Sequence, residues 1–344
     1  LKHLKNPTHD LYVNYGQYGN PILAKFKIVL GQGTKNDRFL SIIKNIYTDP
    51  DNYKVCDSKL GIEDKKIILY LSLEIPQKEC ELDENIVVGV DLGIKIPAVC
   101  TLNTDPSIRY FLGSSEDFLR VRTQIQHQVK RAQKSIKYNA GGHGRKKKLR
   151  PLEKYRKKEK NFREHYNHRL SKEIVNFAVK NHAKYINMEN LSGYDASRFL
   201  ERNWSYFDLQ QKIIYKANQY GIIVRKVNPC YSSQVCSVCG NWHPENRPKG
   251  EKGQAYFCCH NENCKSHEFR NYNADYNASR NIAMADGVMI MNVFDGSKNE
   301  NQKAKKITDE HRKIAREYYG FDDFYQEFKE QEKAKEKAKK EKSA

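Results

Sequence analysis

The sequence predicts an α/β protein built on one mixed sheet flanked by helices, and three observations carry this prediction. Three short apolar runs follow one another closely between residues 86 and 112, as in an antiparallel meander. Two later apolar runs, at 185–188 and 222–227, alternate with stretches of helical periodicity, as in strand–helix units. With 344 residues, the chain is long enough for one large domain and smaller accessory domains.

The first strands of the chain are expected in residues 1–85. Short β-type runs such as ILAKFKIVL and KKIILYLSLEI are separated there by turn-rich segments such as GQGTKND, which predicts a small β-barrel or sheet. The runs IVVGV, AVCTL and IRYFL then form the meander of the main sheet. IVVGV ends in Asp91, a carboxylate at a place where the chain could simply have turned.

Two helices are expected after the meander. Helical periodicity covers residues 115–135 and 151–182, with the glycine-rich break NAGGHG between them. Residues 141–170 hold twelve Lys or Arg against three Asp or Glu. Such a run is most often a solvated helix face, but its concentration here favours contact with phosphates.

The second half of the predicted domain begins with the short strand YINM, which ends in Glu189. A helix over about 204–220, a strand over 222–227, a cysteine-rich insertion and a helix from about Ala274 follow. The final 44 residues hold thirteen Lys or Arg and ten Asp or Glu, which predicts a low-complexity helix or a solvated tail.

Charge and hydropathy narrow the class of protein. The chain has 61 Lys or Arg against 42 Asp or Glu, a formal net charge of +19, which indicates a polyanionic partner, with nucleic acid as the first candidate. The N-terminal segment has no apolar signal core, and no run of 18 apolar residues occurs, so we expect a cytoplasmic protein without a membrane span. Residue 1 is Leu rather than Met, which fits a piece of a longer protein.

Three carboxylates lie at the ends of predicted elements. Asp91 and Glu189 end strands, and Asp275 in NADYNASRNIA begins a helix. Sites form at such strand ends in open α/β sheets, and two divalent ions held by carboxylates can activate water for phosphodiester hydrolysis. Mg²⁺ prefers such oxygen ligands. For any single acid, a helix cap or a surface ion pair is the ordinary interpretation, so spacing alone does not decide.

The cysteines give a more specific pattern. Cys236 and Cys239 form a C-x2-C pair, and after nineteen residues Cys259 and Cys264 form a C-x4-C pair. Two close thiolate pairs are typical of a tetrahedral structural Zn²⁺, whereas a redox C-x-x-C motif needs no second pair. A site closed by four thiolates has no open coordination position, so this zinc should organise a loop rather than catalyse.

One zinc ligand is ambiguous in the sequence, because Cys258 and Cys259 compete for the same place. We prefer Cys259, since Phe257, two residues before it, could then point into a small core. His260 and His267 are alternative ligands.

The order of the motifs identifies a family resemblance. VVGVDLGIKIPAV, INMENLSG, SSQVCSVCG and NADYNASRNIA resemble the pieces of a split RuvC nuclease domain with a zinc ribbon between its second and third acidic motifs. Over roughly residues 86–285, the chain resembles the miniature type V-F CRISPR effector nucleases and, more distantly, the TnpB nucleases of transposons.

The resemblance implies an RNase H-like fold in which Asp91, Glu189 and Asp275 are catalytic acids that bind two Mg²⁺. It also implies an RNA-guided DNA endonuclease with a guide RNA, a double-stranded DNA target and often a homodimer. The implied domains are a wedge-like β-barrel at 1–85, the nuclease at 86–228 and 273–298, the zinc ribbon at 229–272 and a charged tail at 299–344.

Two departures from the family pattern leave alternatives to the function that the resemblance implies. Members usually carry a helical recognition lobe in a longer N-terminal half, whereas about 85 residues precede the first acidic motif here, and the tail after residue 299 has no counterpart. The alternatives are a TnpB-like transposon-associated nuclease or a truncated, non-catalytic module that binds guide RNA and DNA.

Four further side chains each carry two interpretations. Arg280 could hold a substrate phosphate or form a salt bridge, and Arg247 could reach the scissile strand or remain on the surface. Trp204 and Tyr206 are better placed to pack a helix than to stack on a base.

Overall fold

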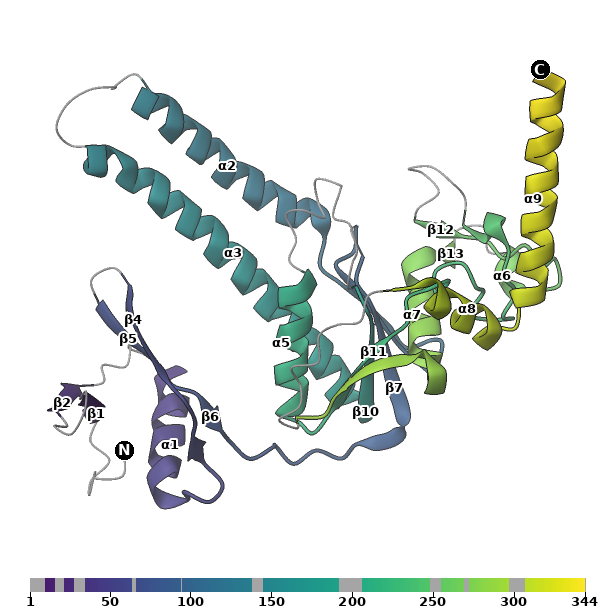
Figure 1. The fold of residues 1–344 in the computed structure, drawn as a ribbon. Helices are drawn as coiled ribbons and strands as arrows, with labels where there is room; N and C mark the ends of the chain where they lie inside the picture. Colours follow the sequence, from purple (N-terminus) through teal and green to yellow (C-terminus); the bar gives the residue numbers. More distant parts are fainter. Residues whose placement is uncertain are drawn as a thin grey trace. The chain divides into compact units, whose positions relative to one another are not determined.

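The structure is a computed structural model, and its contacts divide the chain into two compact units, residues 1–77 and 78–344 (Figure 1). The domain boundaries inferred from the sequence stay a prediction. The residues that the structure describes are 10–15, 22–27, 35–63, 66–93, 95–137, 145–191, 206–247, 255–268, 272–296 and 307–343.

The first unit contains strand pairs and one helix. Its described strands pair two by two, so the wedge-like β-barrel stays a prediction. Helix α1 was not anticipated from the sequence, although its apolar residues Phe39, Ile43 and Ile46 have helical spacing. The elements are β1 (Asp10–Tyr15) with β2 (Ile22–Lys27), α1 (Lys35–Thr48), β3 (Lys54–Val55) with β6 (Leu73–Glu74), and β4 (Lys59–Glu63) with β5 (Lys66–Tyr70).

The second unit is built on a six-stranded mixed sheet with the strand order β14-β11-β10-β7-β8-β9. Strands β7, β8 and β9 form the predicted antiparallel meander, β10 and β11 continue parallel to β7, and β14 is antiparallel to β11. The mixed α/β sheet predicted from the sequence is confirmed. Its strands are β7 (Asp83–Asp91), β8 (Ala98–Leu102), β9 (Arg109–Leu112), β10 (Ala183–Glu189), β11 (Ile223–Val227) and β14 (Ile290–Phe294).

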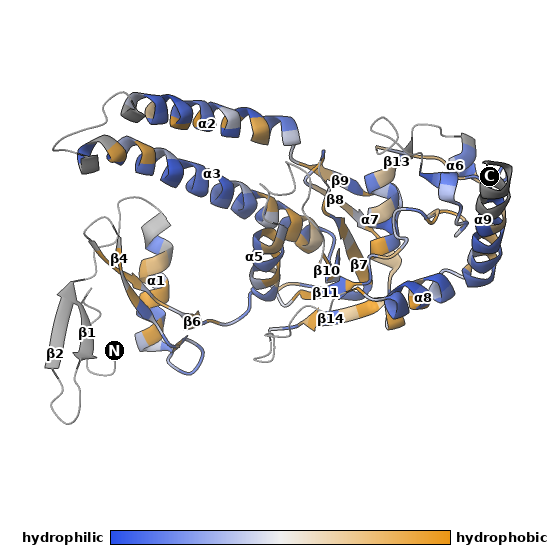
Figure 2. Cartoon of the chain, turned by 45° about the horizontal axis from the view of Figure 1, so that its top comes forward, coloured by the Kyte–Doolittle hydropathy of each residue, from blue (hydrophilic) through white to orange (hydrophobic). Residues whose placement is uncertain are grey.

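Helices cover both faces of this sheet (Figures 1 and 2). Val88 and Val90 belong to a core shared with helices α3 and α5, whereas Gly89 between them faces α7, because side chains alternate along a strand. A Cβ atom at Gly89 would lie 2.1 Å from the carbonyl oxygen of Ser279, so glycine lets α7 approach the sheet. The helices are α2 (Ser115–Lys137), α3 (Arg145–Lys180), α5 (Tyr206–Asn218) and α7 (Ala274–Met284).

Helix α3 begins earlier than the sequence pattern indicated, and it continues through Pro151. A proline inside a helix leaves the carbonyl four residues earlier without its donor. That carbonyl belongs to Lys147, which is exposed, so water can satisfy it. The segment NAGGHG lies outside the described residues.

The C-terminal segment forms two helices, α8 (Asp309–Tyr318) and α9 (Asp322–Ser343). The alternative of a solvated tail is wrong for its first part, because Ala315 is fully buried and Phe321 is 7% exposed. No helix in the described ranges is long and apolar enough to span a membrane. The remaining elements are η1 (Pro244–Asn246), β12 (Tyr256–Phe257), α6 (Lys265–Glu268), β13 (Tyr272–Asn273) and η2 (Gly287–Met289).

Candidate functional site

The three acids singled out from the sequence come together at one edge of the sheet. Asp91 and Glu189 end β7 and β10, which are parallel neighbours, so both residues lie at the same edge. Asp275 lies in the first turn of α7, the helix that packs on β7. A Cβ atom at Gly93 would lie 3.4 Å from Oδ2 of Asp275, which places this carboxylate beside the chain just after Asp91.

Electrostatics show that the three carboxylates share one environment. Burial, with added repulsion from Glu189 and Asp275, holds the pKa of Asp91 well above its usual range. Burial is also the main cause of the raised pKa of Glu189 and of Asp275. The Arg247 guanidinium acts in the opposite direction and lowers the pKa of all three. Buried acids with raised pKa values form a place where an added cation would be stabilised.

Two polar side chains hold Glu189, and sequence reasoning found neither. The Ser232 hydroxyl donates to Glu189 Oε1 at 2.7 Å, and Gln210 Nε2 of α5 donates to the Glu189 backbone carbonyl at 2.9 Å. A single serine in YSSQVC carries no spacing signal, since only the fold of the loop after β11 brings it to Glu189.

Helix α7 is fixed at both of its ends, which fixes Asp275. The Asn273 side chain accepts from the Tyr276 backbone N–H at 3.0 Å and so caps the first turn. At the other end, Asn187 Nδ2 of β10 donates to the carbonyls of Ile282 and Ala285 at 2.9 and 2.8 Å. Asn187 is fully buried, so these bonds tie α7 to the strand that ends in Glu189.

The other basic and aromatic candidates from the sequence differ in where the structure places them. Arg280 is buried and donates to the backbone carbonyl of Leu102, a contact that neither interpretation anticipated. Arg247 acts on the three acids, as described above. Tyr206 packs against the main core, as predicted, and Trp204 lies outside the described residues.

The four predicted zinc ligands form a second cluster. The Sγ atoms of Cys236, Cys239, Cys259 and Cys264 all lie within 4.8 Å of one another, with 3.8 Å between Cys236 and Cys264 and 3.5 Å between Cys239 and Cys259. A tetrahedral zinc with bonds of about 2.3 Å separates its sulfurs by about 3.8 Å, so this set fits such an ion. Phe257 is fully buried against these cysteines.

The competing ligands point elsewhere. Cys258 Sγ lies 3.9 Å from the backbone carbonyls of Cys259 and His267, outside the sulfur cluster. His267 Nδ1 lies 2.7 Å from the Cys259 carbonyl oxygen, and the His260 ring stacks on His243 with 3.8 Å between centroids. Cys259 therefore occupies the place for which Cys258 and the two histidines were alternatives.

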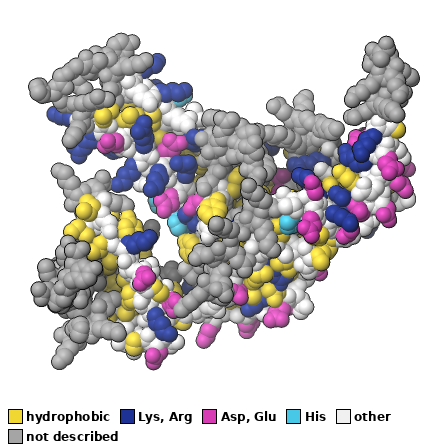
Figure 3. Space-filling model, viewed as in Figure 1, with side chains coloured by type: hydrophobic (Ala, Val, Ile, Leu, Met, Phe, Trp, Pro, Cys, Tyr) yellow, Lys and Arg dark blue, Asp and Glu magenta, His cyan; other side chains and the backbone are white. Residues whose placement is uncertain are grey.

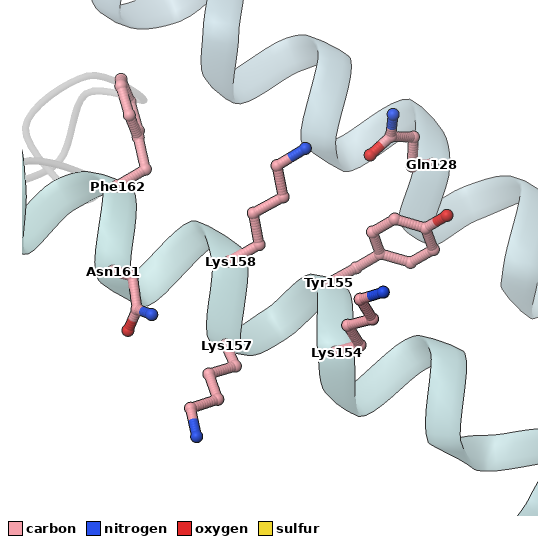
Figure 4. Close-up of a pocket in the computed structure, with 7 residues that line it drawn as sticks. All are labelled: Gln128, Lys154, Tyr155, Lys157, Lys158, Asn161 and Phe162. Atoms are coloured by element: carbon pink, nitrogen blue, oxygen red, sulfur yellow. The ribbon is translucent and has the colours of Figure 1, made fainter. Parts of the chain in front are cut away.

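A basic pocket lies between α2 and α3. Lys154, Tyr155, Lys157 and Lys158 of α3 line it. Tyr155 and Lys158 point toward Gln128 of α2, whereas Lys157 points to the other side of α3 (Figure 4). Figure 3 shows Lys and Arg side chains gathered over this pair of helices, and α3 is hydrophilic over most of its length (Figure 2). Ammonium groups beside an aromatic ring suit a nucleic-acid strand, because phosphates and bases can be bound together.

Comparisons with known proteins agree with the motif order. The family model described as "Cas12f1-like, TNB domain" matches residues 206–282, and the one described as "Probable transposase" matches residues 70–195. A CRISPR-associated endodeoxyribonuclease Cas12f1 from Sulfoacidibacillus thermotolerans is 40% identical over 265 residues, which is 75% of this chain and 58% of that protein. The chain is related to the Cas12f1 proteins.

Further relatives show how far the match extends. The Cas12f1 of Syntrophomonas palmitatica is 36% identical over 60% of this chain and 46% of its own length. A solved structure described as a Cas12f1–sgRNA–target DNA complex has a TM-score of 0.60 and 27% identity, and the match covers 79% of this chain and 54% of that one. The chain thus spans about half the length of the Cas12f1 relatives that it matches. The two family matches include all three acids and all four cysteines.

Proposed function

We propose that this chain is an RNA-guided DNA endonuclease that hydrolyses phosphodiester bonds at Asp91, Glu189 and Asp275. The convergence of these three carboxylates at one sheet edge carries the proposal. The names of the relatives support it, since they are CRISPR-associated endodeoxyribonucleases, and the related solved structure is a complex with guide RNA and target DNA. Guide RNA, double-stranded DNA and a second copy of the chain are the proposed partners.

The fold that we propose for the nuclease is RNase H-like. An antiparallel meander, β7 to β9, continued by the parallel strands β10 and β11 supports it. The four-sulfur cluster supports a zinc ribbon, inserted between the element that carries Glu189 and the helix that carries Asp275. A wedge-like barrel before residue 86 belongs to the same proposal.

The acidic residues are suited to hold divalent ions, and we propose two Mg²⁺. When bound, such ions lower the pKa of water and stabilise charge on the leaving oxygen. The fit rests on the pKa values of Asp91, Glu189 and Asp275, which burial raises. These carboxylates have too little positive charge around them, and a divalent ion would supply it. Arg247 supplies part of that charge and would face the scissile phosphate. Ser232 orients Glu189, and the position of α7 orients Asp275.

The zinc would act through structure rather than chemistry. Its four sulfurs leave no open coordination position, and the loop that bears them is tied to α7. Asn277 of α7 accepts from the Ser237 backbone N–H at 2.9 Å and donates to the Val235 carbonyl at 2.8 Å. A zinc-held knuckle therefore supports the helix that carries Asp275.

The first test is Asp91→Ala in protein expressed with its native genomic neighbourhood, so that its own RNA is purified with it. We expect this variant to retain RNA and target binding and to lose Mg²⁺-dependent cleavage, because phosphate contacts do not use the carboxylate. Glu84→Gln, an exposed acid at the other end of β7, is the matched control and should cut at the parental rate. Cleavage by Asp91→Ala at the parental rate would refute the site assignment.

The alternatives have their own supporting observations. A non-catalytic guide RNA- and DNA-binding module is the first alternative, since the lysines that line the pocket between α2 and α3 could bind nucleic acid without any divalent ion. A wild-type protein that binds RNA and DNA but cuts neither with Mg²⁺ nor with Mn²⁺ would establish that module. A TnpB-like origin is favoured by a TnpB-like protein of Methanocaldococcus jannaschii, 35% identical over 97 residues. RNA from a transposon end in the purified protein would distinguish it from a CRISPR effector.

A further inference from the structure

Two aromatic side chains, Trp242 and Tyr231, anchor the loop that follows β11 to the C-terminal segment, and Tyr231 is the one beside Ser232. The Tyr231 ring meets Phe321 edge-on with 5.2 Å between centroids, and it packs in the same way against Trp242 and Tyr325 at 6.3 and 6.0 Å. Arg316 Nη1 of α8 also lies 3.4 Å from the Tyr231 hydroxyl. Aromatic pairs in this geometry contribute more than their buried area alone, so α8 and α9 hold Tyr231 firmly.

The backbone at Tyr231 is in an unfavourable conformation. Its φ angle is 64°, in the left-handed region, where a side chain as large as tyrosine is rarely found. Such a conformation persists only where the surrounding structure holds it. The Tyr231 carbonyl accepts from the backbone N–H groups of Gln234 and Val235 at 2.9 and 3.0 Å, and the aromatic contacts of the Tyr231 side chain hold the same turn from the side of the C-terminal segment.

The turn determines where the next side chain points. Ser232 donates its hydroxyl to Glu189 Oε1 at 2.7 Å, and within the described part of the chain no other side chain hydrogen-bonds this carboxylate. The Ser232 carbonyl is held by Asn281 Nδ2 of α7 at 2.7 Å. The loop is therefore fixed from two sides, by α7 through Asn281 and by the C-terminal helices through Tyr231.

Helix α8 is docked to the body of the unit at further points. Asn228 Nδ2, at the start of the same loop, donates to the His311 carbonyl at 2.6 Å. The Tyr318 hydroxyl lies 3.1 Å from the Met284 carbonyl and 3.0 Å from Asp286 Oδ1. These contacts connect α8 to the residue that follows β11 and to the C-terminal end of α7. The loop that bears Tyr231 and Ser232 lies between these two elements in the sequence.

We infer that Tyr231 is a positioning residue for the acidic centre: it transmits the docking of α8 and α9 to Ser232 and thereby holds Glu189 in its metal-binding orientation. The inference rests on the proposed function, in which Glu189 holds a divalent ion. Residues 309–325 of the charged C-terminal segment thus help to position the side chains of the acidic centre. Partners that orient a metal-binding carboxylate typically change metal affinity about 10- to 100-fold when removed.

The test measures divalent-ion binding directly, so that it does not depend on cleavage. Mn²⁺ is titrated into the full chain and free Mn²⁺ is followed by electron paramagnetic resonance, for wild type, Tyr231→Ala, Ser232→Ala and the double variant. Both single variants should raise the Mn²⁺ dissociation constant about tenfold. Because both act through one hydrogen bond, the double variant should match Ser232→Ala within about twofold.

Conservative and control variants separate positioning from general loss of structure. Tyr231→Phe keeps the ring and should bind Mn²⁺ as wild type does. Phe111→Ala removes an aromatic ring that is 40% exposed on the outer strand β9 and should also leave binding unchanged. If circular dichroism shows Tyr231→Ala to be unfolded, Tyr231→Leu replaces it. Leucine keeps apolar volume without the ring contacts, so Tyr231→Leu should weaken Mn²⁺ binding to the same extent.

Two outcomes would overturn the inference. Wild-type Mn²⁺ affinity in folded Tyr231→Ala or Tyr231→Leu would show that the C-terminal helices do not act on Glu189. If the dissociation constant of the double variant rose by the product of the two single increases, Tyr231 would act independently of Ser232. Failure of the proposed function would look different, since wild-type protein with its RNA would bind Mn²⁺ and cut no DNA.

Discussion

Replacing Gly89 by alanine tests whether the close packing of α7 on β7 sets the position of Asp275. The new Cβ atom would lie 2.1 Å from the Ser279 carbonyl oxygen and 2.4 Å from the Ala283 backbone nitrogen, whereas ordinary contacts begin near 3.4 Å. Both partners are backbone atoms of α7, so no side chain can turn away. The helix must therefore move by about 1 Å, and Asp275 in its first turn moves with it.

This displacement predicts both a stability and an activity effect. Overpacking of this kind costs about 1–3 kcal/mol, which corresponds to a fall of about 2–10 °C in Tm. A misplacement of about 1 Å in a catalytic group can lower the cleavage rate about 100-fold. Tm is measured by circular dichroism, and cleavage is measured with the co-purified RNA and a matching DNA.

The control for the glycine variant is Gly61→Ala in β4 of the first unit. There the new Cβ atom would lie 2.9 Å from Cε2 of Tyr70, the edge of a side chain that can turn, so Tm should change little. If Gly89→Ala kept both the Tm and the cleavage rate of wild type, α7 would not be held by contact with β7, and the argument for the position of Asp275 would fail.

Three further predictions follow from the other sites. Cys236→Ser should lower the zinc content from about one ion per chain to none, measured by mass spectrometry of the metal; a retained ion would refute the four-cysteine set. Replacing Lys154, Lys157 and Lys158 by glutamine should make the salt dependence of DNA binding less steep by about 2–3 in the logarithmic slope, whereas Lys329→Gln, which removes a surface ion pair with Glu332, should not. In EDTA, wild type should lose more unfolding free energy than Asp91→Asn as the pH rises above about 4, the ordinary pKa of an aspartate, because an acid whose pKa is raised in the folded state loses stabilisation once the pH exceeds its unfolded-state pKa. Equal pH dependence in chemical denaturation would contradict the carboxylate cluster.

The sequence carried enough information to predict the sheet and to select the acids. Buried strands such as IVVGV and AVCTL are continuous apolar runs, and every residue of AVCTL is buried in β8. Strand ends place carboxylates at a sheet edge by geometry that holds for any such sheet, which is why Asp91 and Glu189 could be selected without a structure. The cysteine spacing likewise encodes a local knuckle that needs no long-range contact.

What could not be predicted depends on contacts between distant segments. Ser232 reaches Glu189 across 43 positions of sequence, and its loop is shaped by helices a further 80 or so residues along the chain. The segment beginning at Thr308 has a charged composition that suggests a solvated tail. Phe321, Phe324, Tyr325 and Phe328 do recur at helical spacing, but such spacing indicates one apolar helix face and not the surface on which it packs. For Arg280 the sequence suggested a phosphate contact or a salt bridge, because burial of a guanidinium against a backbone carbonyl cannot be recognised from spacing.

Helix α7 links the two candidate metal centres mechanically. Its first turn presents Asp275 to the acidic centre, while Asn277 and Asn281 on the same helix hold the backbone of the loop between Ser232 and the cysteine knuckle. A disturbance of the knuckle must therefore reach both Asp275, through α7, and Glu189, through Ser232. Loss of zinc should weaken divalent-ion binding at the acids even though the two centres share no ligand, and that coupling follows from the hydrogen bonds of one helix.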